Sequence, residues 1–458
     1  MNRRAMAVLG VACLAVLSAG CSSDDGGGDG AADTTAESTA TTDATADTAV
    51  VTDSAPADTA ETTPEATTAA TEVASTEAPA AAEVPDGEPI KFTAATAVSG
   101  VVAQPEIFDA VDAAVEAING AGGIADPAGG PNHPLEVVRC EAGAGGNVEA
   151  DVALRCAQDS IDEGAIAVLG KYLFGADGTQ TWAQAGIPMI GTSPVETEDF
   201  INEMVYPLSG GAITGGPGVG IALQQAGAKT IALVTGDVDA GRQLPGLMKP
   251  GLASEEDLVQ EVYVPLDPSA DYTPQLSQLV SANPDAIAVF GSSDINVRVI
   301  AGLRSAGYAG LIAVPGTGLT PDGIEVLGDA AEGVLLVSGF EAATGTSDAI
   351  GQFNAEMDAT APDAARTELA VNAWSSVHLF AEVLGELDTI DSASLVAALN
   401  NRPVDLGVAP PFTLGVADNQ LGLPRVFRVT FQVQEISDGE IVPSGDGAFL
   451  DVNDFVTG

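Results

Sequence analysis

The chain has few positively charged residues. Its 458 residues include 15 lysines and arginines against 65 aspartates and glutamates, which gives a formal net charge of −50 at pH 7. Proteins bind nucleic acids mainly through cations that displace counterions from the phosphates, so this balance argues strongly against a nucleic-acid partner. An anionic membrane surface is disfavoured for the same reason. The acidity favours solubility, but it does not indicate a fold.

Histidines and catalytic motifs are also scarce. The two histidines are His133, in a Gly/Pro-rich turn, and His378, within a predicted helix, whereas a zinc site needs three or four converging ligands. Segment 236–243 has the glycine spacing of a phosphate loop but lacks its lysine and its serine or threonine. The sequence contains no nucleophile elbow, Ser-x-x-Lys or His-Glu-x-x-His motif, and nothing supports a triad around His378. We therefore expect no metal, no cofactor and no enzyme activity.

Long apolar runs are confined to the N-terminus. Arg3 and Arg4 precede the apolar stretch 5–17, which is too short to span a bilayer comfortably and is typical of a signal peptide. Segment 17–21 reads Leu-Ser-Ala-Gly-Cys and resembles the lipobox of bacterial lipoproteins, although many lipoboxes carry leucine where this one has serine. The resemblance implies cleavage after residue 20 and lipid attachment at Cys21. Ordinary signal cleavage, with Cys21 left free, is the alternative.

The segment after this cysteine lacks lysine, arginine and aromatic residues. Residues 22–88 consist mostly of alanine, threonine, aspartate, glutamate, serine, glycine and proline. Such a segment cannot bury enough apolar surface to offset the entropy of ordering, and its carboxylates repel one another. We expect residues 21–88 to form a lipidated, disordered acidic stalk that holds the rest of the chain away from a membrane.

From Pro89 onward, short apolar runs alternate with amphipathic stretches of helical length. This pattern predicts an α/β fold in which parallel strands are joined by crossover helices. In residues 105–119, apolar side chains recur at a period near 3.6. The predicted strands are 90–98, 135–139, 166–169, 188–190, 230–234, 261–264, 286–290 and 311–314, and the predicted helices are 105–119, 219–226, 272–283, 295–306 and 369–385. A terminal hairpin is predicted near the end of the chain. Apolar and polar residues alternate over 427–433, a turn signal stands at 437–439, and a second short strand is expected at 440–442.

Five segments of this region resemble one family. They are Ala97–Gly100, Glu116–Ile124, Ala185–Ile190, Leu303–Tyr308 and Ala331–Val334. In their order and spacing they are similar to the leucine/isoleucine/valine-type solute-binding proteins of ABC transporters, which have the type I periplasmic-binding fold. The resemblance implies two lobes, each with a mainly parallel sheet flanked by helices. A small polar or amphiphilic solute, such as an amino acid, an amide or a carboxylate, would be held in the cleft between them, and the lobes would close over it.

The resemblance also implies a division of the chain and a set of partners. Residues 89–209 and 340–411 would form lobe one, and residues 210–339 and 412–458 would form lobe two. An ABC permease would receive the solute, and the lipid anchor would keep the protein on the outer face of the bacterial cell membrane. A regulatory lipoprotein that uses the same closing motion to signal to a membrane partner is the alternative. Open parallel sheets bind ligands at the carboxyl ends of their strands, which agrees with a cleft site.

Ten ligand-contacting positions follow from the resemblance: Ser99, Gln104, Phe174, Gly175, Ser193, Val195, Ala240, Ser293, Asp294 and Thr317. For each hydroxyl residue, helix capping is an equally good explanation. Amino-acid-binding members place an acidic residue and an aromatic ring around the ligand's ammonium group. Here Thr317, Ala240 and Ser293 occupy the corresponding positions. A buried ammonium without an anionic partner is costly, so a plain branched-chain amino acid is not expected unless Asp237, Asp239 or Asp294 substitutes.

Two of the four cysteines lie inside the α/β region. Cys140 and Cys156 bracket a predicted strand and its helix. Because the chain is expected to be exported, we predict a disulfide between them, with two buried thiols as the alternative.

Overall fold

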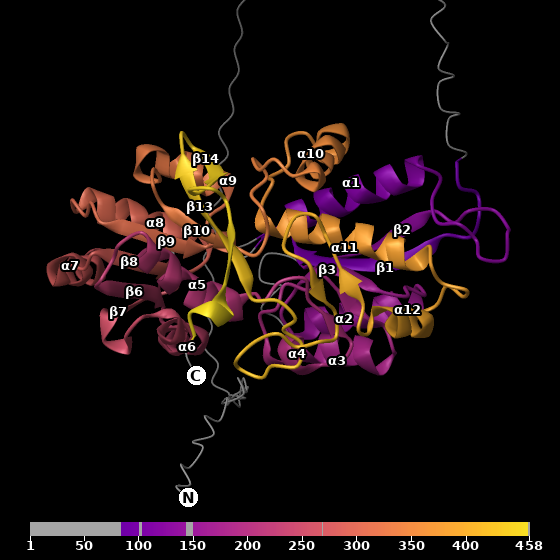
Figure 1. The fold of residues 1–458 in the computed structure, drawn as a ribbon, viewed down its shortest axis with the longest axis horizontal. Coiled ribbons are helices and arrows are strands. Elements are labelled where there is room, and N and C mark those ends of the chain that lie inside the picture. The colour runs from indigo at the N-terminus through magenta and orange to yellow at the C-terminus, as the bar shows by residue number, and fades with distance from the viewer. Residues whose placement is uncertain (1–83, 100–102, 143–149, 268, 457–458) are drawn as a thin grey trace, which may run out of the picture. The chain divides into compact units, whose positions relative to one another are not determined.

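A computed structural model describes residues 84–99, 103–142, 150–267 and 269–456, and the side chains of Ala150, Asp239 and Ala240 are not described (Figure 1). The signal peptide, Cys21 and the stalk therefore lie outside the described residues. No helix among the described residues is both long and apolar enough to cross a membrane.

The first sheet has five parallel strands in the order β2-β1-β3-β4-β5. Its central strands read as apolar runs because helices cover both faces of the sheet. The strands are β1 (Ile90–Ala97), β2 (Leu135–Ala142), β3 (Val168–Tyr172), β4 (Met189–Ile190) and β5 (Val205–Tyr206).

Alternate side chains of β1 pack into two different clusters. Phe92 and Ala94 join the cluster built by α1, α10, α11 and α12, whereas Ala95 and Ala97 join the cluster built by α2 and α3. Successive side chains of a strand point to opposite faces, so these two groups of helices cover opposite faces of the sheet. The helices are α1 (Glu106–Gly120), α2 (Ala150–Asp162), α3 (Ala176–Gln184), α4 (Thr197–Ile201), α10 (Asp348–Thr360), α11 (Glu368–Leu384) and α12 (Ser392–Leu399).

The second sheet begins with parallel strands in the order β7-β6-β8-β9-β10 and continues with antiparallel β13 and β14, while β15 also pairs with β13. Helices α5 and α6 cover one face, and α7, α8 and α9 cover the other. The strands are β6 (Ile231–Gly236), β7 (Leu258–Val264), β8 (Ala286–Phe290), β9 (Leu311–Pro315), β10 (Leu335–Ser338), β13 (Thr430–Ser437), β14 (Glu440–Pro443) and β15 (Phe449–Asp451). The helices are α5 (Ala212–Gln225), α6 (Asp239–Met248), α7 (Thr273–Ala282), α8 (Ser293–Ser305) and α9 (Pro321–Leu327).

The chain passes between the two sheets in three crossovers (Figure 1). The first, residues 207–211, joins β5 to α5, and the second, 339–347, joins β10 to α10. The third, 414–429, runs from β12 (Phe412–Thr413), which pairs with β11 (Pro403–Val404), to β13. The predicted two-lobed α/β fold and its terminal hairpin are confirmed. Asp438 and Gly439 form the hairpin turn with φ of 53° and 81°, as a two-residue turn of this kind requires.

One helix begins earlier than predicted. Segment 210–220 is rich in glycine, so the sequence predicts a helix only from residue 219, yet α5 begins at Ala212. Its glycines allow close packing against neighbouring elements. A Cβ atom on Gly218 would lie 2.8 Å from Cγ1 of Val337, and one on Gly220 would lie 2.7 Å from Cδ2 of Leu252. Tertiary packing therefore overrides the low helix propensity of glycine here.

Candidate functional site

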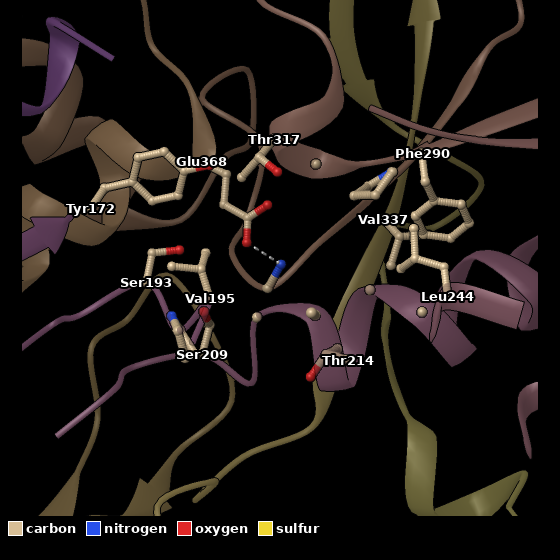
Figure 2. A pocket seen from close by; sticks show the side chains of 18 residues that line it. Tyr172, Ser193, Val195, Ser209, Thr214, Leu244, Phe290, Thr317, Val337 and Glu368 are labelled. Atoms are coloured by element: carbon tan, nitrogen blue, oxygen red, sulfur yellow. Dashed lines mark hydrogen bonds between the residues drawn. The ribbon is translucent and has the colours of Figure 1, made fainter. Parts of the chain in front are cut away.

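A cavity of about 150 Å³ lies between the two lobes, at the carboxyl ends of strands from both sheets (Figure 2). Lobe one contributes Tyr172 at the end of β3, residues 193–195 after β4, and Glu368 at the start of α11. Lobe two contributes the start of α5 and the ends of β8, β9 and β10. This edge of a parallel sheet is where α/β proteins commonly bind ligands.

A buried ion pair holds the loop after β4. Nζ of Lys171 lies 2.8 Å from Oδ1 of Asp199, and the two side chains are 1% and 0% exposed. The other carboxylate oxygen of Asp199 accepts hydrogen bonds of 3.1 Å from the backbone N–H groups of Val195 and Glu196. The N–H of Ser193 donates to the carbonyl of Lys171 at 2.9 Å. The ion pair thus fixes the loop that presents Ser193 and Val195 to the cavity.

The lobe-two wall of the cavity is largely apolar. Leu244, Phe290 and Val337 lie together on one side of the cavity, opposite Tyr172 and the residues that follow β4 (Figure 2). The hydroxyl-bearing Thr317 lies in the short 3₁₀ helix η4 (Gly316–Gly318) after β9. The cavity therefore has one apolar wall and one polar wall.

Glu368 is the one charged side chain among the described residues that line this cavity. Its Oε1 accepts a hydrogen bond of 3.0 Å from the N–H of Gly339 (Figure 2). Burial raises the pKa of this carboxyl to about 7, while the Gly339 N–H, the Arg428 guanidinium and the Ser338 hydroxyl oppose the rise. Glu368 is therefore about half ionised near neutral pH, and one of its carboxyl oxygens already accepts a hydrogen bond.

Tyr172 remains a neutral phenol. Burial raises its pKa to about 12, and the nearby carboxyl of Glu106 adds to the rise. Glu106 is itself buried, which raises its own pKa, and its Oε1 accepts a hydrogen bond of 2.9 Å from the Thr367 hydroxyl. Tyr172 thus adds to the polar wall a hydroxyl that stays protonated around neutral pH.

A larger hollow of about 630 Å³ adjoins the cavity and shares Gly316 and Glu368 with it. Its wall is acidic, and Arg366 is the one basic side chain among its described lining residues. The other carboxylates in this wall belong to Glu106, Asp109, Asp322, Glu341, Asp363 and Glu440. The surroundings of the cavity therefore carry negative charge.

Three of the ten predicted positions line the cavity: Ser193, Val195 and Thr317. Two others support the wall from behind. Phe174 packs edge-on against Tyr172 with ring centroids 5.9 Å apart, and the N–H of Gly175 donates to Oε2 of Glu196 at 2.8 Å.

Four further predicted positions, Ser99, Gln104, Ser293 and Asp294, are not among the described residues that line the cavity. The hydroxyl of Ser293 lies 3.2 Å from that of Thr320, and Asp294 is exposed. Ser99 is exposed, and Gln104 bonds to the end of β1 through its backbone N–H. The side chain of Ala240 is not described.

Tyr172, Glu368, Leu244 and Phe290 were not among the predicted positions. Phe290 ends a predicted strand, which is a local signal, whereas Tyr172 lies three residues beyond the predicted strand 166–169 because β3 extends further than predicted. Glu368 stands directly before a predicted helix, but it reaches the cavity only because α11 packs on the first sheet.

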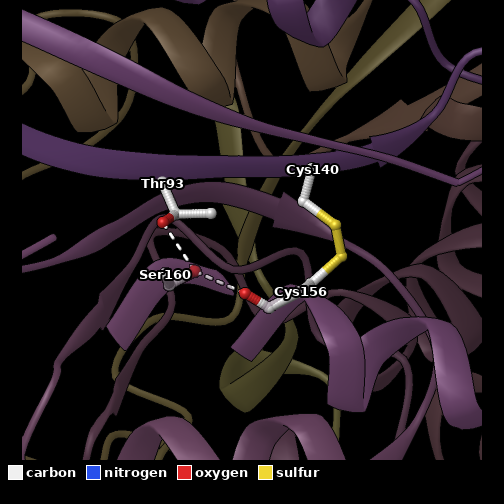
Figure 3. Close-up of a disulfide and its surroundings, with 4 residues drawn as sticks. All are labelled: Thr93, Cys140, Cys156 and Ser160. Atoms are coloured by element: carbon white, nitrogen blue, oxygen red, sulfur yellow. Dashed lines mark hydrogen bonds between the residues drawn. A yellow bond between two sulfur atoms is a disulfide. The ribbon is translucent and has the colours of Figure 1, made fainter. Parts of the chain in front are cut away.

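The predicted disulfide is present. Cys140 on β2 and Cys156 on α2 are bonded, with their Cα atoms 5.5 Å apart (Figure 3). Beside it, the Thr93 hydroxyl donates to Oγ of Ser160, whose own hydroxyl donates to the carbonyl of Cys156. The bridge ties α2 to the first sheet. Among the residues that the structure describes, no cluster of histidine, cysteine or carboxylate side chains is placed to hold a metal ion.

The family model for periplasmic binding proteins matches residues 89–431. The chain belongs to the periplasmic binding protein family. Members of this family bind solutes without converting them, so the chain is a binding protein and not an enzyme. The family also places the folded region outside the cytoplasm.

Solved structures with this fold bind different solutes. A branched-chain amino acid transporter substrate-binding protein from Streptococcus pneumoniae, in complex with isoleucine, is 18% identical with a TM-score of 0.64, over 77% of this chain and 98% of that one. A solute-binding protein of an ABC transporter from Rhodopseudomonas palustris, in complex with p-hydroxybenzoic acid, is 17% identical with a TM-score of 0.66. The match covers 80% of this chain and 98% of that one.

A fatty acid ABC transporter substrate-binding protein from Thermomonospora curvata is 16% identical with a TM-score of 0.65, over 82% of this chain and 97% of that one. No curated protein matches the sequence. At these identities, the solved structures support the fold and leave the solute open.

Proposed function

We propose that the protein is the extracytoplasmic solute-binding receptor of an ABC importer, which captures a small amphiphilic solute between its lobes and presents it to a permease. The cavity lined by both lobes carries this proposal, because a solute bound there contacts both lobes and favours their closed arrangement. We propose that residues 89–209 and 340–411 form lobe one and that residues 210–339 and 412–458 form lobe two. The proposal also keeps a lipid anchor at Cys21 and a stalk that gives the receptor reach.

The cavity favours a solute with an amine or another strong hydrogen-bond donor. Oε2 of Glu368 lies next to Gly316, which also lines the cavity, and no lysine or arginine is among the described lining residues. A charge-assisted hydrogen bond from an ammonium group to this carboxylate is stronger than one between neutral groups. A solute whose only charge is a carboxylate would instead be repelled by Glu368 and by the acidic hollow next to it.

The apolar wall of the cavity favours a solute with an apolar body. Leu244, Phe290 and Val337 offer an apolar surface to the body of the solute. Of the solutes named for the solved relatives, isoleucine has both an ammonium group and an apolar side chain, whereas p-hydroxybenzoic acid has no ammonium group. Glu368 supplies the anionic partner that the sequence did not reveal, so an amino acid or an amine with an apolar body is the proposed ligand.

A thermal-shift screen tests this function. The mature chain is heated with L-isoleucine, other apolar amino acids, alkylamines, amides, p-hydroxybenzoate and fatty acids. We expect amine-bearing apolar solutes to raise the melting temperature, because a ligand at about 100 times its Kd stabilises the native state by about 2.7 kcal/mol. A response to carboxylates alone would contradict the proposed ligand class. No response to any solute would contradict the receptor function.

A further inference from the structure

We infer that Arg428 is the positioning residue of this site: without lining the cavity, it ties the three crossovers together and fixes the carboxylate of Glu368 towards the ligand. The inference rests on the proposed function, in which Glu368 receives the donor group of the solute. Arg428 lies in the third crossover and is 3% exposed. It touches neither hollow, so any effect on the ligand passes through other residues.

The guanidinium of Arg428 joins all three crossovers. Its Nη2 donates to the carbonyl of Leu208 in the first crossover at 2.6 Å, and Nε donates to the same oxygen at 3.2 Å. Its Nη1 donates to the carbonyl of Gly339 in the second crossover at 2.6 Å. A planar guanidinium has five donors in a fixed arrangement, so it can hold these two carbonyls at once, whereas a single ammonium group lacks that geometry.

Gly339 connects this clamp to the cavity. Its carbonyl accepts from Arg428, and its N–H donates to Oε1 of Glu368. A side chain cannot be added at this point, because a Cβ atom on Gly339 would lie 2.9 Å from Cβ of Ser209 and 3.2 Å from Oε1 of Glu368. A continuous series of hydrogen bonds therefore joins Glu368 at the cavity to Gly339 in the second crossover, then to Arg428 in the third and to Leu208 in the first.

The charge of Arg428 also acts on Glu368. The hydrogen-bond partners of the Arg428 guanidinium among the described residues are carbonyl and hydroxyl oxygens and not carboxylates. Burial lowers the pKa of Arg428 to about 10, and Glu368 opposes that fall, while Arg428 in turn lowers the pKa of Glu368. The two groups thus favour each other's charged forms at longer range than an ion pair.

Few other groups act on this carboxyl. At the end of β10 and the start of the second crossover, the Ser338 hydroxyl and the Gly339 N–H favour its charged form. From lobe one, the Tyr172 phenol lines the same cavity, and the carboxyl of Glu106 approaches through its bond to Thr367. Within the described part of the chain, Arg428 is the cation that lowers the pKa of Glu368, so its removal is expected to make this carboxyl harder to ionise.

Titration of Glu368 without ligand tests the inference. Carbon-13 NMR of the glutamate side-chain carboxyls follows its ionisation, with the resonance assigned by its loss in Glu368→Gln. We expect an inflection near pH 7 in the mature chain and, in Arg428→Gln, an inflection higher by about one pH unit or more.

Arg425 provides the matched control. It is another buried arginine of the same crossover, but its Nε donates to the carbonyl of Val205. Arg425→Gln should leave the inflection within about 0.3 units, since removing it leaves the contacts of Glu368 intact. If Arg428→Gln does not fold, Arg428→Lys is measured, with a smaller upward shift expected because an ammonium cannot hold both carbonyls.

An unchanged inflection in the Arg428 variant, or an equal shift in Arg425→Gln, would overturn the positioning role. The titration is carried out without ligand, so its result does not depend on whether the proposed ligand binds. Failure of the Arg428 inference can therefore be distinguished from failure of the proposed receptor function.

Discussion

Individual residues set up the polar wall through buried charge. Lys171 and Asp199 form an ion pair that is shielded from solvent, and Asp199 also orders the N–H groups that lead into the wall. Two charges are expensive to bury, and the cost is offset only when both are present and well bonded. Removing one partner leaves the other buried and unpaired.

We predict that Lys171→Met lowers the free energy of unfolding by about 3–5 kcal/mol, because Asp199 would stay buried without the ammonium group that pairs with it. Arg155→Ala is the control, since Arg155 pairs with Asp151 on the exposed surface of α2 and should cost less than about 0.5 kcal/mol. Urea unfolding of both variants gives the comparison. A loss below about 1 kcal/mol in Lys171→Met would show that the buried pair is not important for stability.

Among the elements, α5 owes its place to small residues. Its first turn lines the cavity, and its glycines let it approach β10 and α6 closely. Helix propensity alone would favour alanine over glycine by about 1 kcal/mol at an interior position. Close packing reverses that preference wherever a methyl group has no room.

We predict that Gly218→Ala destabilises the protein by about 1–3 kcal/mol, because the new methyl group would overlap the side chain of Val337. Gly351→Ala in α10 is the matched control. Nothing lies within 4 Å of a Cβ atom there, so this variant should gain about 0.5–1 kcal/mol. Thermal unfolding measures both, and a stabilising Gly218→Ala would mean that α5 is not closely packed.

The elements also show what sequence alone can predict. Strands and the longer helices follow from apolar periodicity, whereas Ser193 and Thr317 follow from the family resemblance. Glu368 could not be found in this way, because it lies 175 residues after Ser193 in the sequence and reaches the same cavity only after α11 packs on the first sheet. The early start of α5 was missed because close packing, and not local propensity, decides it.

For the whole molecule, the central feature is that ligand contact and lobe connection share residues. Glu368 faces the cavity and is bonded to the second crossover, which Arg428 links to the other two. A solute that engages Glu368 therefore acts at the point where the lobes are joined. This arrangement is suited to a receptor whose lobes close on the ligand.

Isothermal titration calorimetry tests this account most directly. The tightest-binding amine from the screen and the same molecule without its amine are titrated into the mature chain and into Glu368→Gln. The pKa of Glu368 is about 7, so this carboxyl becomes protonated and loses its charge as the pH falls below that value. We therefore predict that the amine binds about tenfold more weakly at pH 6 than at pH 8.

In Glu368→Gln we predict an affinity lower by about 10- to 100-fold at pH 8 and no comparable pH dependence. The analogue without its amine should bind weakly to both proteins. Equal affinity of the mature chain for the amine and the analogue, or unchanged affinity in Glu368→Gln, would contradict the account.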